Sequence, residues 1–266
     1  MNACAAALLT TGFGCAYTQV ADHSSDGAAP KNRSERPRRF PGPDQAVRLD
    51  GDREACELAL LVTGEVDPPE NVWRTIRDDL DNIRQYSSIS MPELREISYR
   101  PVYRVTSLVL VFDFGAAERI REHTYTDWDE LNRTWGTRVE SIRDRWDGRA
   151  EVTLATNLCV DLTAAIGDYR FLYGVSDVFP PKTEDDGSSI FMAYDDFERR
   201  YVFRDAWGTC EDGCDQSRFV FIRIAGLSPH FQERYDPDIQ PAPPWWDEAR
   251  EIMRQNREWE RVRGGQ

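Results

Sequence analysis

The chain has 266 residues, of which 40% are hydrophobic and 11% aromatic, and its formal net charge is −14. This length and composition are typical of a globular protein with a sizeable core, and they exclude a disordered chain. The acidic balance argues against nucleic acid and anionic headgroups as partners, because both bind to basic surfaces.

The N-terminal segment is predicted to be an export signal rather than part of a fold. Residues 3–15 read ACAAALLTTGFGC, an apolar run that is too short to span a bilayer and has the length of a signal-peptide core. Gly12-Phe13-Gly14-Cys15 resembles a bacterial lipobox, in which the lipid would be attached to Cys15. Gly12 stands where Leu is usual, and no Lys or Arg precedes the run. Residues 1–15 are therefore predicted to be a signal peptide of the lipoprotein type, with secretion without lipid and no export as the alternatives.

The segment that follows is predicted to be a flexible linker covering residues 16–47. From Ala21 to Ala46 the chain is polar, rich in Pro, Ser and Arg, and without periodicity. Contact with a membrane is expected only through the lipid anchor. Residues 48–266 are predicted to form a single globular α+β domain.

The first part of this domain, residues 56–86, is predicted to be a strand followed by a helix. CELALLVTGEV, which begins at Cys56, is an apolar run read as a β-strand. Pro68 and Pro69 are typical of a helix start, and apolar residues recur at helical spacing from there to residue 86. Three acidic residues lie mostly off this apolar stripe and are predicted to form a solvated face, namely Asp78, Asp79 and Asp81.

Residues 102–179 read as strand, helix, strand, strand, helix, strand. VYRVTSLVLVFDF is the strongest strand pattern, and a short helix before Gly136 follows it. Asp147-Gly148 is a hairpin turn between two strands, and CVDLTAAIGDY and RFLYGVSDVF then read as a short helix and a strand. This order predicts a ferredoxin-like βαββαβ core, with a four-stranded antiparallel sheet that carries two helices on one face.

Two further elements are expected to extend this core. Residues 190–225 are predicted to be a β-hairpin, because the aromatic residues of YVF and FVF alternate along two facing runs. Residues 245–262 follow a Pro-rich segment and are predicted to be a helix with Glu/Arg pairs three and four residues apart. Its apolar stripe is expected to pack on the core, with a partner groove as the minor alternative: Trp245, Ala249, Ile252 and Trp259.

The cysteine count predicts disulfides. Cleavage would remove Cys4 and lipidation would use Cys15, which leaves four cysteines, an even number, as an oxidising compartment favours. Three pairings of these four are possible. The spacing Cys210-x3-Cys214 suits a local disulfide that closes the loop of the hairpin and sets its register. Cys56 and Cys159 would then be partners, provided that the fold brings them together.

Metal and redox chemistry at this loop are less favoured. The three histidines, His23, His123 and His230, do not pair at the ligand spacing of a zinc site. Thioredoxin-like motifs have two residues between their cysteines, whereas here there are three. A calcium loop through Glu211, Asp212 and Asp215 lacks the alternating oxygen ligands and the distal Glu of known loops. No metal and no cofactor are predicted.

Catalytic motifs are also missing from the sequence. It contains no Gly-x-Ser-x-Gly elbow, no phosphate-binding Gly-rich loop and no His-Glu-x-x-His. A glycosidase needs only two carboxylates, and the chain has 47 acidic residues, so that activity stays open. A non-catalytic protein is the favoured expectation over an enzyme.

Three stretches together resemble a family of bacterial secreted or lipid-anchored proteins that has no settled activity. They are TDWDELNRTWG, YVFRDAWGTCEDGC and PPWWDEAR, and the resemblance spans about Cys56 to Arg250. Its most specific element is Trp207-Gly208-x-Cys210-x3-Cys214 with aromatic residues on both sides. The resemblance implies an extracytoplasmic location but no mechanism.

Three functions are consistent with these observations. The first is a non-catalytic, lipid-tethered or secreted domain of the cell envelope that binds a protein or peptide. The second is a protease-inhibitor or propeptide-like module, because the βαββαβ order is similar to that of propeptide-like inhibitors of subtilisin-type proteases, although fold alone does not give function. The third is a carbohydrate-binding or carbohydrate-active protein, since the eight Trp residues suit stacking on sugars.

Overall fold

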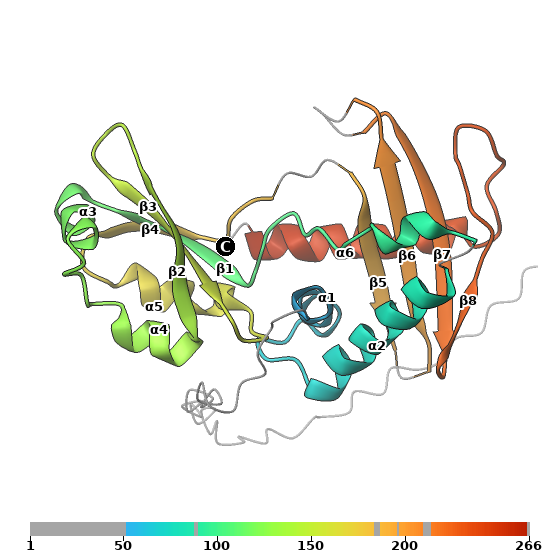
Figure 1. Ribbon diagram of the computed structural model, residues 1–266, viewed down its shortest axis with the longest axis horizontal. Helices are drawn as coiled ribbons and strands as arrows, with labels where there is room; N and C mark the ends of the chain where they lie inside the picture. The colour runs from blue at the N-terminus through green and yellow to red at the C-terminus, as the bar shows by residue number, and fades with distance from the viewer. Residues whose placement is uncertain (1–51, 88–89, 184–186, 196, 210–213, 265–266) are drawn as a thin grey trace, which may run out of the picture. The chain divides into compact units, whose positions relative to one another are not determined.

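The computed structural model describes residues 52–87, 90–183, 187–195, 197–209 and 214–264. All of them belong to the compact unit formed by residues 39–266. The described residues form a mixed α+β fold with two antiparallel sheets of four strands each, β2-β3-β1-β4 and β5-β6-β7-β8 (Figure 1). The predicted signal peptide, its Cys15 and the predicted linker lie outside the described residues.

The segment that begins at Arg53 is the helix α1 (Arg53–Thr63), so the prediction of a strand from Cys56 is wrong. Residues 55–61 are all buried. A helix that is buried on every side has no polar face, and its continuous apolar run cannot be told from a buried strand by periodicity. The helix ends at Gly64, whose φ of 65° is left-handed and whose N–H donates to the carbonyl of Leu60 at 3.0 Å.

The predicted helix over residues 69–86 is confirmed as α2 (Glu70–Tyr86). Asp78 and Asp81 are exposed, as the solvated face predicted. The same prediction is wrong for Asp79, which is buried and accepts a hydrogen bond from Arg199 Nε at 2.6 Å. The residues of α2 alone could not predict this burial, because the strand that covers Asp79 lies more than a hundred residues further on in the sequence.

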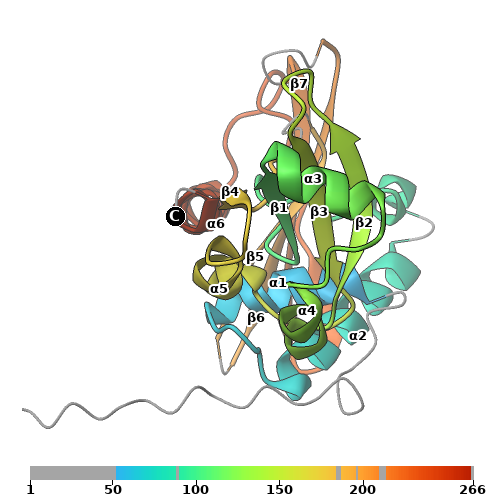
Figure 2. The ribbon, with the colours of Figure 1, turned by 90° about the vertical axis from the view of Figure 1, so that its left-hand side faces the viewer.

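The first sheet combines four strands that are antiparallel to their neighbours, with β1 and β3 in the centre. Helices α3 and α4 lie in the connection from β1 to β2, and the helical segments η2 and α5 lie in the connection from β3 to β4 (Figure 2). Helix α3 was not predicted, and it is capped by Asp113, whose side chain accepts from the backbone N–H of Ala116 at 2.8 Å. The bounds are β1 (Ser107–Phe112), α3 (Phe114–Arg121), α4 (Asp129–Trp135), β2 (Thr137–Asp144), β3 (Ala150–Thr156), η2 (Leu162–Ala165), α5 (Ile166–Arg170) and β4 (Val175–Phe179).

One face of this sheet packs against those helices. Alternate residues of β1 point into this core, as expected for a strand with a period of two. They are Leu108, Leu110 and Phe112, and each is fully buried. Phe112 makes edge-on ring contacts with Tyr125 and Trp128, at centroid distances of 5.2 and 5.6 Å.

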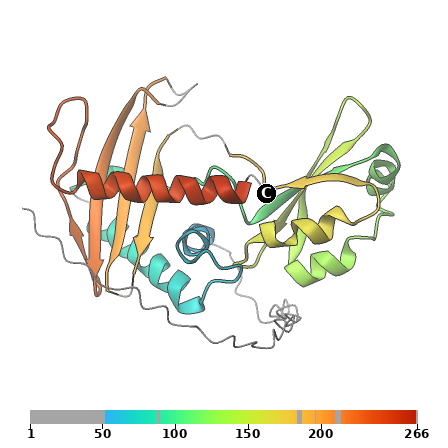
Figure 3. The same ribbon diagram turned by 180° about the vertical axis from the view of Figure 1, so that it is seen from behind.

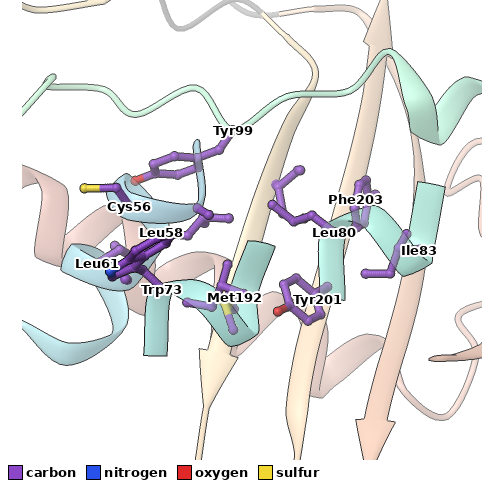
Figure 4. Packing of buried hydrophobic residues seen from close by; sticks show 14 of the residues in the cluster. Cys56, Leu58, Leu61, Trp73, Leu80, Ile83, Tyr99, Met192, Tyr201 and Phe203 are labelled. Carbon is purple, nitrogen blue, oxygen red and sulfur yellow. The ribbon is translucent and has the colours of Figure 1, made fainter. Parts of the chain in front are cut away.

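The second sheet is covered by helices on both faces (Figures 1 and 3). The hairpin predicted for residues 190–225 is confirmed in part: β6 and β7 pair in antiparallel order, but the range also contains β5, which pairs with the other side of β6. The aromatic residues of β6 and β7 lie on opposite faces: Tyr201 and Phe203 pack with α1 and α2 (Figure 4), whereas Phe219 and Phe221 pack beneath the C-terminal helix. The bounds are η1 (Pro92–Arg95), β5 (Ser189–Tyr194), β6 (Arg199–Trp207), β7 (Gln216–Ala225) and β8 (Ser228–Phe231).

The predicted C-terminal helix is confirmed as α6 (Trp246–Gly264). Its apolar stripe packs on the sheet as expected, because Ala249 and Ile252 are buried together with Trp245 in one core cluster. Near the end of α6, Arg263 pairs with the buried Asp161 and donates to the carbonyl of Gly64 at 2.7 Å. No helix in the described part of the chain is long and apolar enough to cross a bilayer.

The disulfide between Cys56 and Cys159 is confirmed, with a Cα–Cα distance of 5.5 Å. It joins α1 to the segment that follows β3. Cys214 is also disulfide-bonded. Its predicted partner, Cys210, lies outside the described residues.

Candidate functional site: an aromatic tip on the first sheet

One end of the first sheet carries four large aromatic side chains that are exposed to solvent. They come from three separate connections: the start of α3, the turn between β2 and β3, and the loop between α5 and β4. Their exposed fractions are far above those of the aromatic residues in the core. We call them the aromatic tip: Phe114 (58% exposed), Trp146 (95%), Phe171 (91%) and Tyr173 (64%).

The strand register explains why these connections meet. Phe112, the last residue of β1, pairs with Ala150, the first residue of β3, and with Val175, the first residue of β4. In an antiparallel sheet, the segments next to such paired ends lie at the same edge. The sheet therefore brings together residues that are up to 59 positions apart, as the printed numbers of Phe114 and Tyr173 show.

Direct contacts hold the three connections together. The backbone N–H of Asp113 donates to the carbonyl of Gly174 at 2.8 Å, which ties the start of α3 to the loop before β4. On the other side, the ring of Phe114 lies against the turn between β2 and β3, because a Cβ atom built on Gly148 would be 2.9 Å from Phe114 Cδ2. Arg121 on α3 also binds the carboxylate of Asp144 on β2 at 2.6 Å.

Tyr125 anchors the aromatic tip through contacts of its hydroxyl and its ring. Its hydroxyl donates to the carbonyl of Tyr173 at 2.7 Å, and its ring packs edge-on against Trp128 with centroids 5.0 Å apart. Burial, together with the nearby carboxylate of Asp127, raises the pKa of Tyr125 well above its usual value. The hydroxyl therefore stays a hydrogen-bond donor at every physiological pH.

A cavity of about 310 Å³ lies beside this tyrosine. Its wall on β2 consists of two apolar side chains that are partly exposed, Val139 (40%) and Ile142 (45%). The remaining lining comes from α3 and the segment after it: Ile120, His123, Tyr125 and Trp128. The volume lies at the lower end of the range for ligand pockets.

Sequence reasoning did not identify the aromatic tip. The patterns described above do not single out Phe114, Trp146, Phe171 or Tyr173. A local signal exists, because Trp146 precedes the turn Asp147-Gly148 and Tyr173 precedes Gly174. Large aromatic residues beside tight turns are unusual, since turns lie at the surface.

The cysteines predicted as structural lie elsewhere in the fold, and the described part of the chain contains no group of three His, Cys, Asp or Glu residues placed to hold a metal ion. Of the calcium ligands considered above, Glu211 and Asp212 lie outside the described residues. Asp215 instead accepts a hydrogen bond from the backbone N–H of Thr209 at 3.2 Å.

The stretches that carry the family resemblance are structural in this fold. TDWDELNRTWG contains α4 and its Gly136 end, YVFRDAWG is most of β6, and PPWWDEAR leads into α6. Comparison of the chain with known protein families, with curated proteins and with solved structures found no match.

Proposed function

We propose that this protein is a non-catalytic module of the bacterial cell envelope that binds a protein or peptide partner through the aromatic tip. The observation that carries this proposal is the gathering of four exposed aromatic side chains on three connections at one end of a sheet. Contiguous exposed apolar side chains mark interaction sites, and aromatic residues supply most of the binding energy in protein interfaces.

The surroundings of the tip fit a protein partner better than a membrane surface. Two guanidinium groups next to it are paired with carboxylates: Arg145 pairs with Glu151 at 2.7 Å and Arg149 binds Asp147. Paired groups of this kind leave little positive charge in this turn to attract anionic lipids. They do match the polar rim that surrounds the apolar centre of a protein interface.

The cavity beside Tyr125 gives the partner a place to insert an apolar side chain. Addition of a partner strand to the exposed edge of β2 is disfavoured, because the ladder is irregular between Val139 and Ser141 and the strand carries several charges. Bulges and charged residues protect sheet edges from pairing with other chains. We therefore propose recognition through side chains at the tip rather than through a shared sheet.

We further propose that the protein is exported and held at a membrane by a lipid on Cys15, with residues 16–47 as the tether. The disulfide between Cys56 and Cys159 supports this location, because disulfides persist in oxidising compartments. A tether of this length and composition would have a mean reach of roughly 30 Å.

The binding proposal can be tested by photo-crosslinking in the native envelope. A photoreactive phenylalanine placed at Trp146 is expected to give a discrete adduct with one protein, and the additional change Phe171→Ala should reduce its yield several-fold. The matched control is the same photoreactive residue at Leu227, which is 83% exposed but lies in the turn between β7 and β8. The same adducts from both positions, or none from Trp146, would contradict the proposal.

A second candidate is a protease-inhibitor or propeptide-like module with a ferredoxin-like core. The strand order β2-β3-β1-β4, with helices in the β1–β2 and β3–β4 connections, supports this finer description of the first sheet. The module should then inhibit a subtilisin-type protease at stoichiometric amounts. Lack of inhibition across a panel of such proteases would remove this candidate.

Carbohydrate binding is the third candidate, and the exposed ring of Trp146 is the observation in its favour. Stacking of a sugar on this ring should quench its fluorescence. A glycan array followed by fluorescence titration of the protein and its Trp146→Ala variant separates this candidate from protein binding.

A further inference from the structure

A larger cavity, of about 590 Å³, lies between α6 and the sheet face that α6 covers. Four arginine side chains line it, whereas the chain as a whole has a net charge of −14. We call these residues, with the cavity between them, the arginine groove: Arg204, Arg254, Arg257 and Arg261.

The helix α6 and the strand β6 direct the four guanidinium groups toward the same cavity. Arg254, Arg257 and Arg261 follow each other at intervals of three and four residues, so they share one face of α6. Arg204 lies on β6 directly opposite Phe219 of β7, on the face that packs toward α6. The groove therefore has one wall on the helix and one on the sheet.

The floor of the groove is apolar. Phe191 and Phe219 are buried on the sheet, and Met253 faces them from α6. The guanidinium group of Arg257 lies 5.0 Å from the centroid of the Phe191 ring. A ligand in the groove would meet aromatic surface and positive charge within the same few ångströms.

Carboxylates of the protein neutralise this charge only in part. Glu258 is the one acidic residue among the described lining residues. Arg254 pairs with Glu251 and Glu258, each at 2.7 Å, but all three side chains are exposed and such pairs are weak. Arg257 pairs with the buried carboxylate of Glu260 at 3.2 Å. Arg261 makes no ion pair with any carboxylate in the part of the chain that the structure describes.

We propose that the arginine groove binds a small organic anion that carries two or more carboxylate or phosphate groups on an apolar or aromatic body. Arginine recognises both groups through two parallel hydrogen bonds, and several arginines around one cavity favour a ligand with several such groups. The cavity volume is within the range of small-molecule sites, and its apolar floor favours an organic ligand over a bare inorganic ion. This site is separate from the aromatic tip and does not depend on the proposed protein partner.

The direct test is calorimetric titration of the full chain with benzene-1,3,5-tricarboxylate, which combines a ring with three carboxylates. Propane-1,2,3-tricarboxylate has the same charges without the ring, and inorganic phosphate has neither ring nor carbon body. We expect binding in the order benzene tricarboxylate, propane tricarboxylate, phosphate, and weaker binding as salt is added. Arg254→Gln combined with Arg261→Gln should weaken the first ligand about tenfold or more.

The matched control is Arg250→Gln, because Arg250 is an exposed arginine on the same helix that pairs with Asp247 outside the groove. The control and Trp146→Ala should bind the tricarboxylate as the wild type does, and circular dichroism should show that all variants are folded. The double arginine variant removes only exposed side chains, so we expect it to fold. No binding to the wild type at millimolar ligand, or equal loss in the control, would overturn the proposal. Phosphate binding as tight as that of the benzene tricarboxylate would overturn the requirement for an apolar body.

Discussion

Cys56 on α1 and Cys159 after β3 are 103 residues apart in the sequence and form a disulfide with their Cα atoms 5.5 Å apart. The bond joins an element in the core of the second sheet to the segment that leaves the first sheet. A crosslink that closes so long a loop strongly restricts the unfolded chain.

Removal of this disulfide should therefore be among the most destabilising changes in the protein. We expect Cys56→Ala with Cys159→Ala to lower the free energy of unfolding by up to about 5 kcal/mol. Replacement of Cys214 by alanine should lower it by about 2 kcal/mol if the bond closes the short loop to Cys210. Guanidinium denaturation of both variants shows which loss of stability is the larger. A smaller loss from the Cys56/Cys159 variant would show that native-state contacts hold the two segments without the bond.

The buried carboxylate of Asp79 should be essential to the packing of α2 on the second sheet. Arg199 donates to it from Nε at 2.6 Å and from Nη2 at 3.0 Å, and the hydroxyl of Tyr201 donates at 2.8 Å. Asp79→Asn would leave the guanidinium group of Arg199 without its counter-charge, and breaking such a buried pair costs about 3–5 kcal/mol. Thermal or chemical unfolding measures the loss.

Asp78→Asn is the control for this change, since Asp78 is the exposed neighbour on the same helix. It should alter stability by less than about 1 kcal/mol. Similar losses for both substitutions would mean that the Asp79–Arg199 pair contributes little beyond an ordinary surface pair.

Stability should fall with rising pH in part because of Glu57. Its carboxyl group is buried in α1, and burial raises its pKa above 4.5, although the hydroxyl of Thr106 (2.7 Å away) and the charges of Arg104 and Arg53 act in the opposite direction. The folded state therefore holds a proton that the unfolded state releases, so the free energy of unfolding decreases as pH rises from about 4.5 through the raised pKa. Glu57→Gln removes this titration and keeps an acceptor for Thr106.

We expect the stability of Glu57→Gln relative to the wild type to be greater at pH 7 than at pH 4, as measured by urea denaturation across that range. Glu118→Gln, an exposed position on α3, corrects for the change in net charge. Burial also raises the pKa of Glu260, so part of the slope should persist in the variant. A relative stability of Glu57→Gln that does not change with pH would contradict the prediction.

Gly136 should not tolerate a side chain. It ends α4 with a φ of 61°, and a Cβ atom there would lie 2.6 Å from Cγ of Leu158. Gly136→Ala should cost more than about 1 kcal/mol, because both the backbone conformation and the packing oppose it. Gly167→Ala is the control: it lies in α5 with nothing within 4 Å of the added atom, and alanine there should stabilise by up to about 1 kcal/mol. Equal changes in stability for Gly136→Ala and Gly167→Ala would show that neither the backbone conformation nor the packing at Gly136 opposes a side chain.

Much of the local structure could be predicted from the sequence because it depends on neighbouring residues. The apolar spacing of α2, the turn Asp147-Gly148 between β2 and β3, and Gly136 at the end of α4 are all local signals, and the structure confirms each of them. The failures concern residues whose surroundings come from distant parts of the chain. The strand predicted at Cys56 is the helix α1, because full burial removes the polar face that would mark a helix.

The sequence by itself determined the class of fold, most of its helices and strands, and the even set of cysteines that predicted the bond between Cys56 and Cys159. Only the tertiary structure decided which side chains share a surface. Strand register brought Phe114, Trp146 and Tyr173 to one end of a sheet, and packing of α6 on β6 placed Arg204 across a cavity from Arg261. Such surfaces are made of residues tens of positions apart, and no local periodicity records them because each residue contributes from a different element.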